Sequence, residues 1–145
     1  MIEIRKISVC ETYEIRKDVL RENIQLTEKM DGDFDKDTIH LGAFINKELG
    51  CVASFMQHDS DLFTGSQYRL RGMATHKKHQ YKGLGKTILM EAEKFLLTKH
   101  VGLLWCNARV FSLKFYEKSG YKRIGKEFDV EFVGLHFVMY KELKK

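Results

Sequence analysis

A short basic segment with two glycines, Gln80-Tyr-Lys-Gly-Leu-Gly-Lys86, carries the clearest chemical signal in this sequence. It lies between an alternating apolar and polar segment, typical of a strand, and a long amphipathic segment, typical of a helix. A glycine-bearing loop at a helix N-terminus gathers backbone N–H groups that can bind a phosphate. The segment therefore predicts an anion-binding loop.

Two common phosphate-binding motifs do not match this loop. A P-loop needs a glycine five positions before Gly85, and Gln80 stands there. A dinucleotide-binding loop needs a third glycine at position 88, which is Ile88. The pattern that fits is Q/R-x-x-G-x-G/A, formed by Gln80, Gly83 and Gly85. Taken alone, a plain glycine turn that opens a surface helix explains this pattern equally well.

The surrounding segments predict the elements that must position the loop. Periodicity predicts strands at 2–8, 40–46, 50–58, 67–75, 101–106, 121–125 and 135–142, and helices at 9–22, 84–99 and 110–118. The Asp-rich residues 23–38 read as a loop. This order of elements predicts an α/β fold, a mixed sheet with helices on its faces.

Alternation and helical spacing also predict which side chains point the same way. In the 67–75 strand, we expect one face to carry Tyr68, Leu70, Gly72 and Ala74, and the other to carry Arg69, Arg71, Met73 and Thr75. In the 9–22 helix, the expected inward positions are Tyr13, Ile15, Val19 and Leu20.

A second motif, Asn107-Ala-Arg-Val-Phe-Ser-Leu-Lys-Phe-Tyr-Glu-Lys-Ser-Gly-Tyr121, directly follows the buried 101–106 strand. Together with Gln80–Lys86, in this order and at this separation, it resembles the GCN5-related N-acetyltransferase (GNAT) superfamily across about residues 40–125. The C-terminal segment 134–141 is similar to the closing strand of small bacterial members. Ser112 departs from the alanine that such proteins commonly carry. The resemblance implies one N-acetyltransferase domain over 1–145, with a mixed, mostly antiparallel sheet that splays where coenzyme A binds.

The resemblance also implies a binding role for each part of the two motifs. The backbone of Met73, Ala74 and Thr75 would pair with the pantetheine arm of acetyl-CoA, and the Met73 N–H would polarise the thioester carbonyl. The pyrophosphate would lie on the N–H groups of Gln80, Tyr81, Lys82, Gly83, Leu84, Gly85 and Lys86. Asn107 would bind the pantetheine arm, or cap the following helix. Lys77 and Lys78 are weaker candidates for the ribose phosphate.

For catalysis, the resemblance implies that Tyr116 protonates the leaving thiolate as a general acid. Phe115 is adjacent on the same short helix, so we expect it to pack in the core while Tyr116 faces the site. The general base is not readable from the sequence. His136 is the first candidate, because a histidine titrates near neutral pH. Glu131, His40 and His58 are alternatives, and for each of these residues an ordinary surface or core role is the simpler interpretation.

The predicted function is an acetyl-CoA-dependent N-acetyltransferase, in which a primary amine attacks the thioester directly in a ternary complex. Cys106 lies in an apolar run and is expected to be a buried, inert thiol. The alternative is a catalytically silent acyl-CoA-binding module of the same fold. A nucleic-acid-binding protein is a poor fit, because the net charge is only +5 and the lysines are scattered. The acceptor is a small-molecule or peptide amine that the sequence does not identify.

Composition limits the remaining possibilities. A chain of 145 residues with 43% apolar and 31% charged residues predicts one globular domain. It has no apolar run long enough to span a membrane, and its first residues are expected to form a strand rather than a signal peptide. Three cysteines without paired spacing argue against disulfides or a zinc site and favour the cytoplasm. The Asp-rich 31–37 segment lacks the glycine and glutamate of a calcium loop, so no metal is expected. It offers charge for a cationic amine, although a solvated loop explains it as well. A homodimer through a sheet edge is one option that the sequence leaves open.

Overall fold

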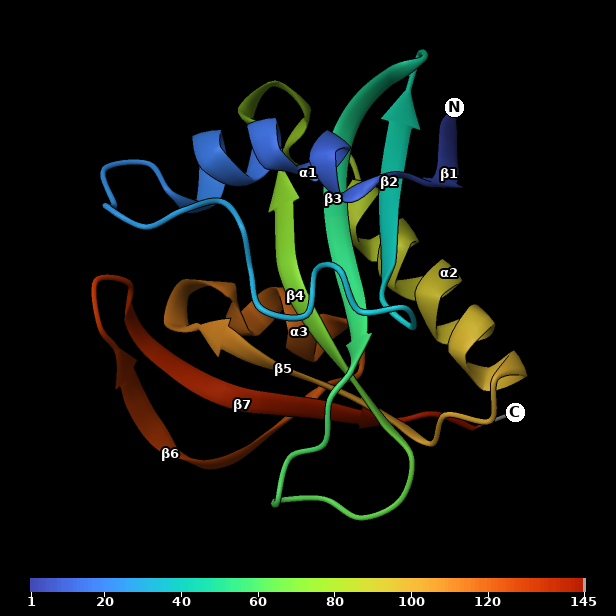
Figure 1. The fold of residues 1–145 in the computed structure, drawn as a ribbon, viewed down its shortest axis with the longest axis vertical. Coiled ribbons are helices and arrows are strands. Elements are labelled where there is room, and N and C mark those ends of the chain that lie inside the picture. Colours follow the sequence, from blue (N-terminus) through green and yellow to red (C-terminus); the bar gives the residue numbers. More distant parts are fainter. Residues whose placement is uncertain (145) are drawn as a thin grey trace.

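Seven strands form one mixed sheet, in the order β1-β2-β3-β4-β5-β7-β6 (Figure 1). The computed structural model describes residues 1–144. All neighbouring strands are antiparallel except β4 and β5, as the family resemblance implied. The strands are β1 (Ile2–Lys6), β2 (Ile39–Ile45), β3 (Glu48–Gln57), β4 (Gln67–Thr75), β5 (Leu103–Arg109), β6 (Lys122–Val130) and β7 (Gly134–Glu142). The α-helices are α1 (Val9–Ile15), α2 (Leu84–Thr98) and α3 (Leu113–Lys118).

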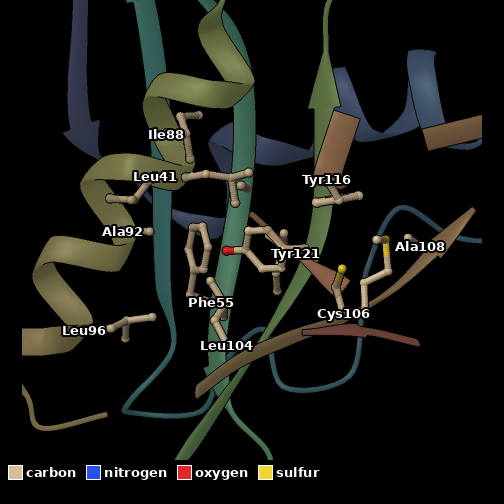
Figure 2. Close-up of a cluster of buried hydrophobic side chains, with 14 of the residues drawn as sticks. Leu41, Phe55, Ile88, Ala92, Leu96, Leu104, Cys106, Ala108, Tyr116 and Tyr121 are labelled. Atoms are coloured by element: carbon tan, nitrogen blue, oxygen red, sulfur yellow. The ribbon is translucent and has the colours of Figure 1, made fainter. Parts of the chain in front are cut away.

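Helices cover both faces of this sheet, which confirms the predicted class. Helix α2 buries Ile88, Leu89, Ala92 and Leu96 against one face, in the stripe expected from its periodicity. Helix α1 lies on the opposite face, where Ile15 packs against Val52 and Ala74 (Figure 1). Figure 2 shows the larger cluster, on the α2 side, which includes Phe55, Leu104, Cys106, Tyr116 and Tyr121.

The N-terminal helix differs from the single helix predicted over residues 9–22. Ser8 caps α1 in a reciprocal pair with Glu11, and the α-helix ends at Ile15. A π-helical turn, η1 (Arg16–Leu20), follows. Arg16 was not an expected inward position, yet it is fully buried. The buried residues of the two segments are Thr12, Ile15 and Arg16, whereas Tyr13, Val19 and Leu20 are only half-buried.

A buried polar network accounts for the position of Arg16. Its guanidinium donates two hydrogen bonds of 2.9 Å to the Asp33 carboxylate, one of 2.8 Å to Ser54 Oγ and one of 3.0 Å to the Glu28 carbonyl. His40 Nδ1 lies 2.6 Å from the same Ser54 hydroxyl. The network ties the irregular 23–38 segment to β2 and β3. Asp33 therefore serves a structural role in the Asp-rich loop.

A bulge in β4 changes the predicted facing of its side chains. Val52 pairs with Ala74 and Ser54 with Arg71, so β4 has one residue more than β3 between these pairs. Gly72 lies in the bulge with a φ of +67°, a conformation that favours glycine. Consequently Leu70 packs on the α2 side and Ala74 on the α1 side. The expected shared face of Leu70 and Ala74 was wrong, because simple alternation does not continue through a bulge.

Strand β5 and helix α3 also differ from their predicted boundaries. Strand β5 begins and ends later than the expected 101–106, so Asn107 lies inside the strand, opposite Val138, and does not cap a helix. A 3-10 turn, η3 (Val110–Ser112), precedes α3, and together they occupy the predicted 110–118 helix. Gly120 then ends α3 with a φ of +94°. The Tyr121 N–H bonds the Tyr116 carbonyl at 3.0 Å, as in a Schellman motif.

Candidate active site

Strands β4 and β5 pair along only part of their length. The paired residues are Gln67–Arg69 and Leu103–Trp105, after which the two strands diverge (Figure 1). Strand β5 stays paired with β7 up to Arg109. A cleft of about 800 Å³ opens between the diverging strands. In residues 1–144, the β4 edge from Leu70 to Thr75 has no β5 partner, so the backbone groups on this edge, apart from the Thr75 carbonyl that accepts from Gln80, are free for a ligand that adds to the sheet.

The predicted anion loop borders one end of this cleft. Its backbone N–H groups from Tyr81 to Lys86 have no acceptor within the described part of the chain. The first hydrogen bond of α2 is donated by the Thr87 N–H to the Gly83 carbonyl, at 3.1 Å. Six consecutive free donors at the positive end of a 15-residue helix form a strong anion site.

The two loop glycines have different physical roles. Gly83 precedes α2 with a φ of +82°, and a side chain there would meet nothing within 4 Å. It therefore supplies a left-handed backbone beside open space. A Cβ on Gly85 would lie 3.0 Å from the Phe115 ring, so the absence of a side chain there lets α3 approach α2. Gly85 therefore clears space for Phe115, while Gly83 lies beside open space.

Side chains around the loop fix its shape. Gln80 donates a hydrogen bond of 3.3 Å to the Thr75 carbonyl, which ties the loop to the end of β4. His79 is buried, lines the cleft and lies 3.1 Å from Glu48, and the sequence did not single it out. Tyr81 is fully exposed with a φ of +64°. Lys82 does not line the cleft and lies 3.5 Å from His79.

The lysines considered for the ribose phosphate are already paired. Lys77 contacts Glu22 at 2.6 Å, and Lys78 contacts Glu48 at 3.1 Å. All four groups are largely exposed, so these ion pairs are weak and open to exchange. Lys86, in contrast, lines the cleft at the start of α2.

Tyr116 lines the cleft from α3 and is also part of the core. Only 6% of its surface is exposed, and its ring packs edge-on against Phe115 and Tyr121. Its hydroxyl lies beside the Cys106 thiol. Burial, with added repulsion from Cys106, raises the pKa of Tyr116 well above its usual range, so the phenol keeps its proton. Phe115 is the less buried of the two rings and also lines the cleft, contrary to the expected division between core and site.

The cysteine in the cleft is not an activated nucleophile. Burial raises the pKa of the Cys106 thiol to about 12, and burial raises that of Cys51 to about 11. Thiolates are the reactive form, and neither residue forms one at neutral pH. All three cysteines are free.

Among the candidate bases, the structure brings only His136 to the cleft. Its Nδ1 lies 2.7 Å from the Gly134 carbonyl, which makes Nδ1 the protonated nitrogen and leaves Nε2 as the acceptor in the neutral ring. His40 belongs to the Arg16 network, and His58 lies against Trp105 and Arg69. Glu131 is exposed in the turn between β6 and β7. The other predicted binding residues Met73, Ala74, Thr75, Leu84 and Asn107 also line the cleft.

Four arginines in the cleft were missed as site residues. They are Arg21, Arg69, Arg71 and Arg109. Two of them alternate along β4, a spacing that places both on one face of a strand and that was visible in the sequence. Within residues 1–144, no cluster of three or more His, Cys, Asp or Glu side chains is arranged to hold a metal ion. The same residues contain no helix long and apolar enough to cross a bilayer.

A mixed sheet in which β4 and β5 diverge, with an anion loop at the N-terminus of α2 beside the gap, defines an acyl-CoA N-acyltransferase fold. Residues 11–143 match the family model of the acetyltransferase (GNAT) domain. The chain is 40% identical to an uncharacterised N-acetyltransferase of Bacillus subtilis, YitI, over 99% of this chain and 98% of that protein. This chain therefore belongs to the GNAT acetyltransferase family, as the two sequence motifs indicated, and is an acyltransferase.

Solved structures with low sequence identity share the fold. A putative N-acetyltransferase from Lactobacillus plantarum superposes with a TM-score of 0.81 at 17% identity, over 99% of both chains. An aminoglycoside 6'-N-acetyltransferase complexed with coenzyme A superposes with a TM-score of 0.72 at 14% identity, over 99% of this chain and 98% of that chain. These likenesses concern the architecture.

Proposed function

We propose that this protein transfers the acetyl group of acetyl-CoA to a primary amine by direct attack in a ternary complex. The observation that carries the proposal is the open β4 edge beside six free loop N–H groups. The open edge suits the pantetheine amides, and the loop suits a pyrophosphate. Family membership supports the acetyl donor, because GNAT proteins use acetyl-CoA.

In this proposal, the β4 backbone positions the thioester. Met73 follows the bulge at Gly72, and its N–H polarises the thioester carbonyl and stabilises the oxyanion that forms when the amine attacks. Ala74 and Thr75 bind the pantetheine amides as a neighbouring strand would. Asn107, on the facing strand β5, binds the same arm from the other side.

His136 and Tyr116 would carry out the two proton transfers of the reaction. His136 Nε2 accepts a proton from the incoming ammonium, directly or through water, because only the free amine is nucleophilic. Tyr116 donates its hydrogen bond to the leaving thiolate. A free thiol has a pKa of about 8.5, below that of the buried phenol, so complete proton transfer requires that the cleft also desolvate the thiolate. Direct attack is favoured over an acyl-enzyme because the pKa of Cys106 is about 12.

Calorimetric titration with acetyl-CoA tests the donor, and absence of binding at millimolar ligand would overturn the assignment. Thiol release over a panel of amines tests turnover. We expect Tyr116→Phe to bind acetyl-CoA normally and to lower kcat about 10²–10⁴-fold, the usual contribution of a general acid. Tyr140→Phe is the matched control, since Tyr140 does not line the cleft.

The second candidate is a module of the same fold that binds acyl-CoA without turnover. Tight binding of acetyl-CoA with no thiol release for any amine would favour it. We further propose that residues 1–145 act as one cytoplasmic domain, although Lys145 lies outside the described residues. Three unpaired cysteines support this location, since they suit a reducing compartment. Size-exclusion chromatography with light scattering decides between a monomer and the homodimer considered above.

A further inference from the structure

The part of the cleft that the donor does not need is strongly and uniformly cationic. Arg21, Arg69, Arg71 and Arg109 line it, and no aspartate or glutamate does. Pairwise register places Arg69 beside Trp105, and Arg109 beside His136. Arg109 therefore lies next to the histidine that would take a proton, while Arg69 lies where β4 and β5 are still paired.

None of these four guanidinium groups is neutralised by a carboxylate within 4 Å in residues 1–144. Arg21 and Arg109 donate only to backbone carbonyls, those of Thr27 and Leu20. Arg69 lies 3.3 Å from His58 and stacks over Trp105, and its buried Nε has no hydrogen-bond partner. The Nε of the structural Arg16 is unpartnered in the same way, so the case for a ligand depends on the missing carboxylate partners of the four arginines and not on this atom.

Burial makes the charged form of these guanidinium groups less favourable than it would be in water. Burial, with repulsion from Arg71, lowers the pKa of Arg69 to about 10. Burial lowers the pKa of Arg71 as well, and Asp31 partly opposes this effect. Both groups remain cationic at neutral pH. The protein keeps several like charges partly buried side by side, a placement that an anionic ligand would relieve.

The Asp-rich segment offsets this charge only in part, because Asp31 acts on Arg69 and Arg71 without lining the cleft. Asp33 is engaged by Arg16 in the buried network. The only residue of the 23–38 segment that lines the cleft is Met30. The idea that this segment attracts a cationic amine is therefore not supported by where its carboxylates lie.

The arginines are also on the wrong side of the thioester to serve the donor phosphates. Arg69 and Arg71 precede Met73 on β4, whereas the anion loop follows Thr75. Arg71 and Met73 are separated by the bulged Gly72, so their Cα atoms lie at most about 7 Å apart. This separation suits a small acceptor whose anionic group lies only a few bonds from its amine.

Resting on the proposed acetyl transfer, we propose that the acceptor is a small amine that carries an oxyanion, a carboxylate or a phosphate, bound by Arg71 and Arg69. Guanidinium groups bind either oxyanion through paired hydrogen bonds, which an ammonium does not reproduce. Arg109 lies beside His136 and would also contact the acceptor, close to its attacking amine.

Matched pairs of amines test the proposal by thiol release. The pairs are alanine with alaninamide, and O-phosphoethanolamine with ethanolamine, with spermidine as a cationic probe. We expect kcat/KM to be about ten- to hundredfold higher for the anionic member of at least one pair, the usual gain from a charged hydrogen bond. The pair that shows the gain identifies carboxylate or phosphate. The amine of alaninamide is less basic than that of alanine, so a larger fraction of it is unprotonated and nucleophilic at neutral pH. This difference favours alaninamide and therefore works against the expected preference for alanine.

Variants separate recognition from folding. Arg71→Gln should lower kcat/KM for the anionic member about ten- to hundredfold and lower that of the uncharged member much less, with little change in the acetyl-CoA Kd; Arg71→Lys should restore part of the loss. Arg5→Gln is the control, because Arg5 is exposed and outside the cleft. Equal effects of Arg71→Gln on both members, or faster turnover of spermidine, would overturn the inference while acetyl transfer stands.

A binding measurement keeps the inference testable without turnover. Thermal shift with each amine should show stabilisation by the anionic member alone, and its loss in Arg71→Gln. If neither anionic amine stabilises the protein more than its uncharged partner, and none is acetylated preferentially, the inference is wrong. Failure to bind acetyl-CoA would instead refute the proposed function. The thermal shift would still test whether the arginines bind the anionic amines.

Discussion

Replacing Asp33 by alanine should destabilise the protein far more than an ordinary loop substitution. The change removes three hydrogen bonds, two of 2.9 Å from Arg16 and one of 2.8 Å from the Met30 N–H, and leaves the fully buried Arg16 guanidinium without its counter-ion. Breaking a buried ion pair by deleting one partner costs about 3–5 kcal/mol. A chain of 145 residues has an unfolding entropy of roughly 0.3 kcal/mol/K, so the melting temperature should fall by about 10–16 °C.

Thermal and urea unfolding followed by circular dichroism measure this change. Asp35→Ala is the matched control, because Asp35 is an exposed aspartate two residues away in the same segment. The double variant Arg16→Met with Asp33→Leu should recover much of the lost stability, since an apolar pair of similar volume avoids the buried charge. A loss below about 1 kcal/mol for Asp33→Ala would refute the reasoning, because surface pairs already contribute that much.

The pH dependence of this pair has a defined sign. Burial raises the pKa of Asp33, but hydrogen bonds from Arg16 and the Met30 N–H lower it by more, so its pKa lies below the ordinary value. A lowered pKa contributes stability that is complete above the unfolded pKa of about 3.9 and is lost as the pH falls through the folded pKa. The difference in stability between wild type and Asp33→Ala should therefore shrink below about pH 4.

Three further changes probe other parts of the molecule. Gly83→Ala should cost about 1–2 kcal/mol in chemical unfolding, because Gly83 has a φ of +82° in open space, and a cost near zero would contradict this. Ellman's reagent should label Cys10 quickly in the native protein and Cys106, whose pKa is about 12, only after denaturation; rapid labelling of all three thiols would disprove the burial argument. Glu93→Ala removes the acceptor of a hydrogen bond of 2.8 Å from the buried Tyr121 hydroxyl and should cost about 1–3 kcal/mol by urea unfolding, whereas an unchanged midpoint would count against that bond.

The sequence predicted the architecture well because its elements have strong periodicity and distinct ends. The stripe on α2 and the glycine after α3 identified their elements, and the Gln80–Lys86 and Asn107–Tyr121 motifs located the cleft. The predicted roles of the site residues stay predictions, since no bound ligand tests them.

What the sequence did not provide depends on long-range geometry. The bulge at Gly72 reverses the facing of later β4 residues, and one inserted residue leaves no periodic trace. Arg16 is buried because Asp33 and Ser54, distant in sequence, satisfy its charge and donors. The arginine-lined part of the cleft arises from strands β4 and β5 and the turn after η1, which periodicity treats as separate elements.

The short contact between β4 and β5 has a consequence for how the protein responds to its surroundings. Within residues 1–144, three β4–β5 residue pairs and the hydrogen bond from the Gly102 N–H to the Ser66 carbonyl are the backbone links between the β1–β4 half of the sheet and the β5–β7–β6 half. A molecule that lies in the cleft and bonds to both edges would replace the missing rungs and link the halves. Ligand at a hundred times its Kd would then stabilise the fold by about 2.7 kcal/mol. At a saturating concentration of that molecule, amide exchange along both edges would be slower and the protein would resist proteolysis better.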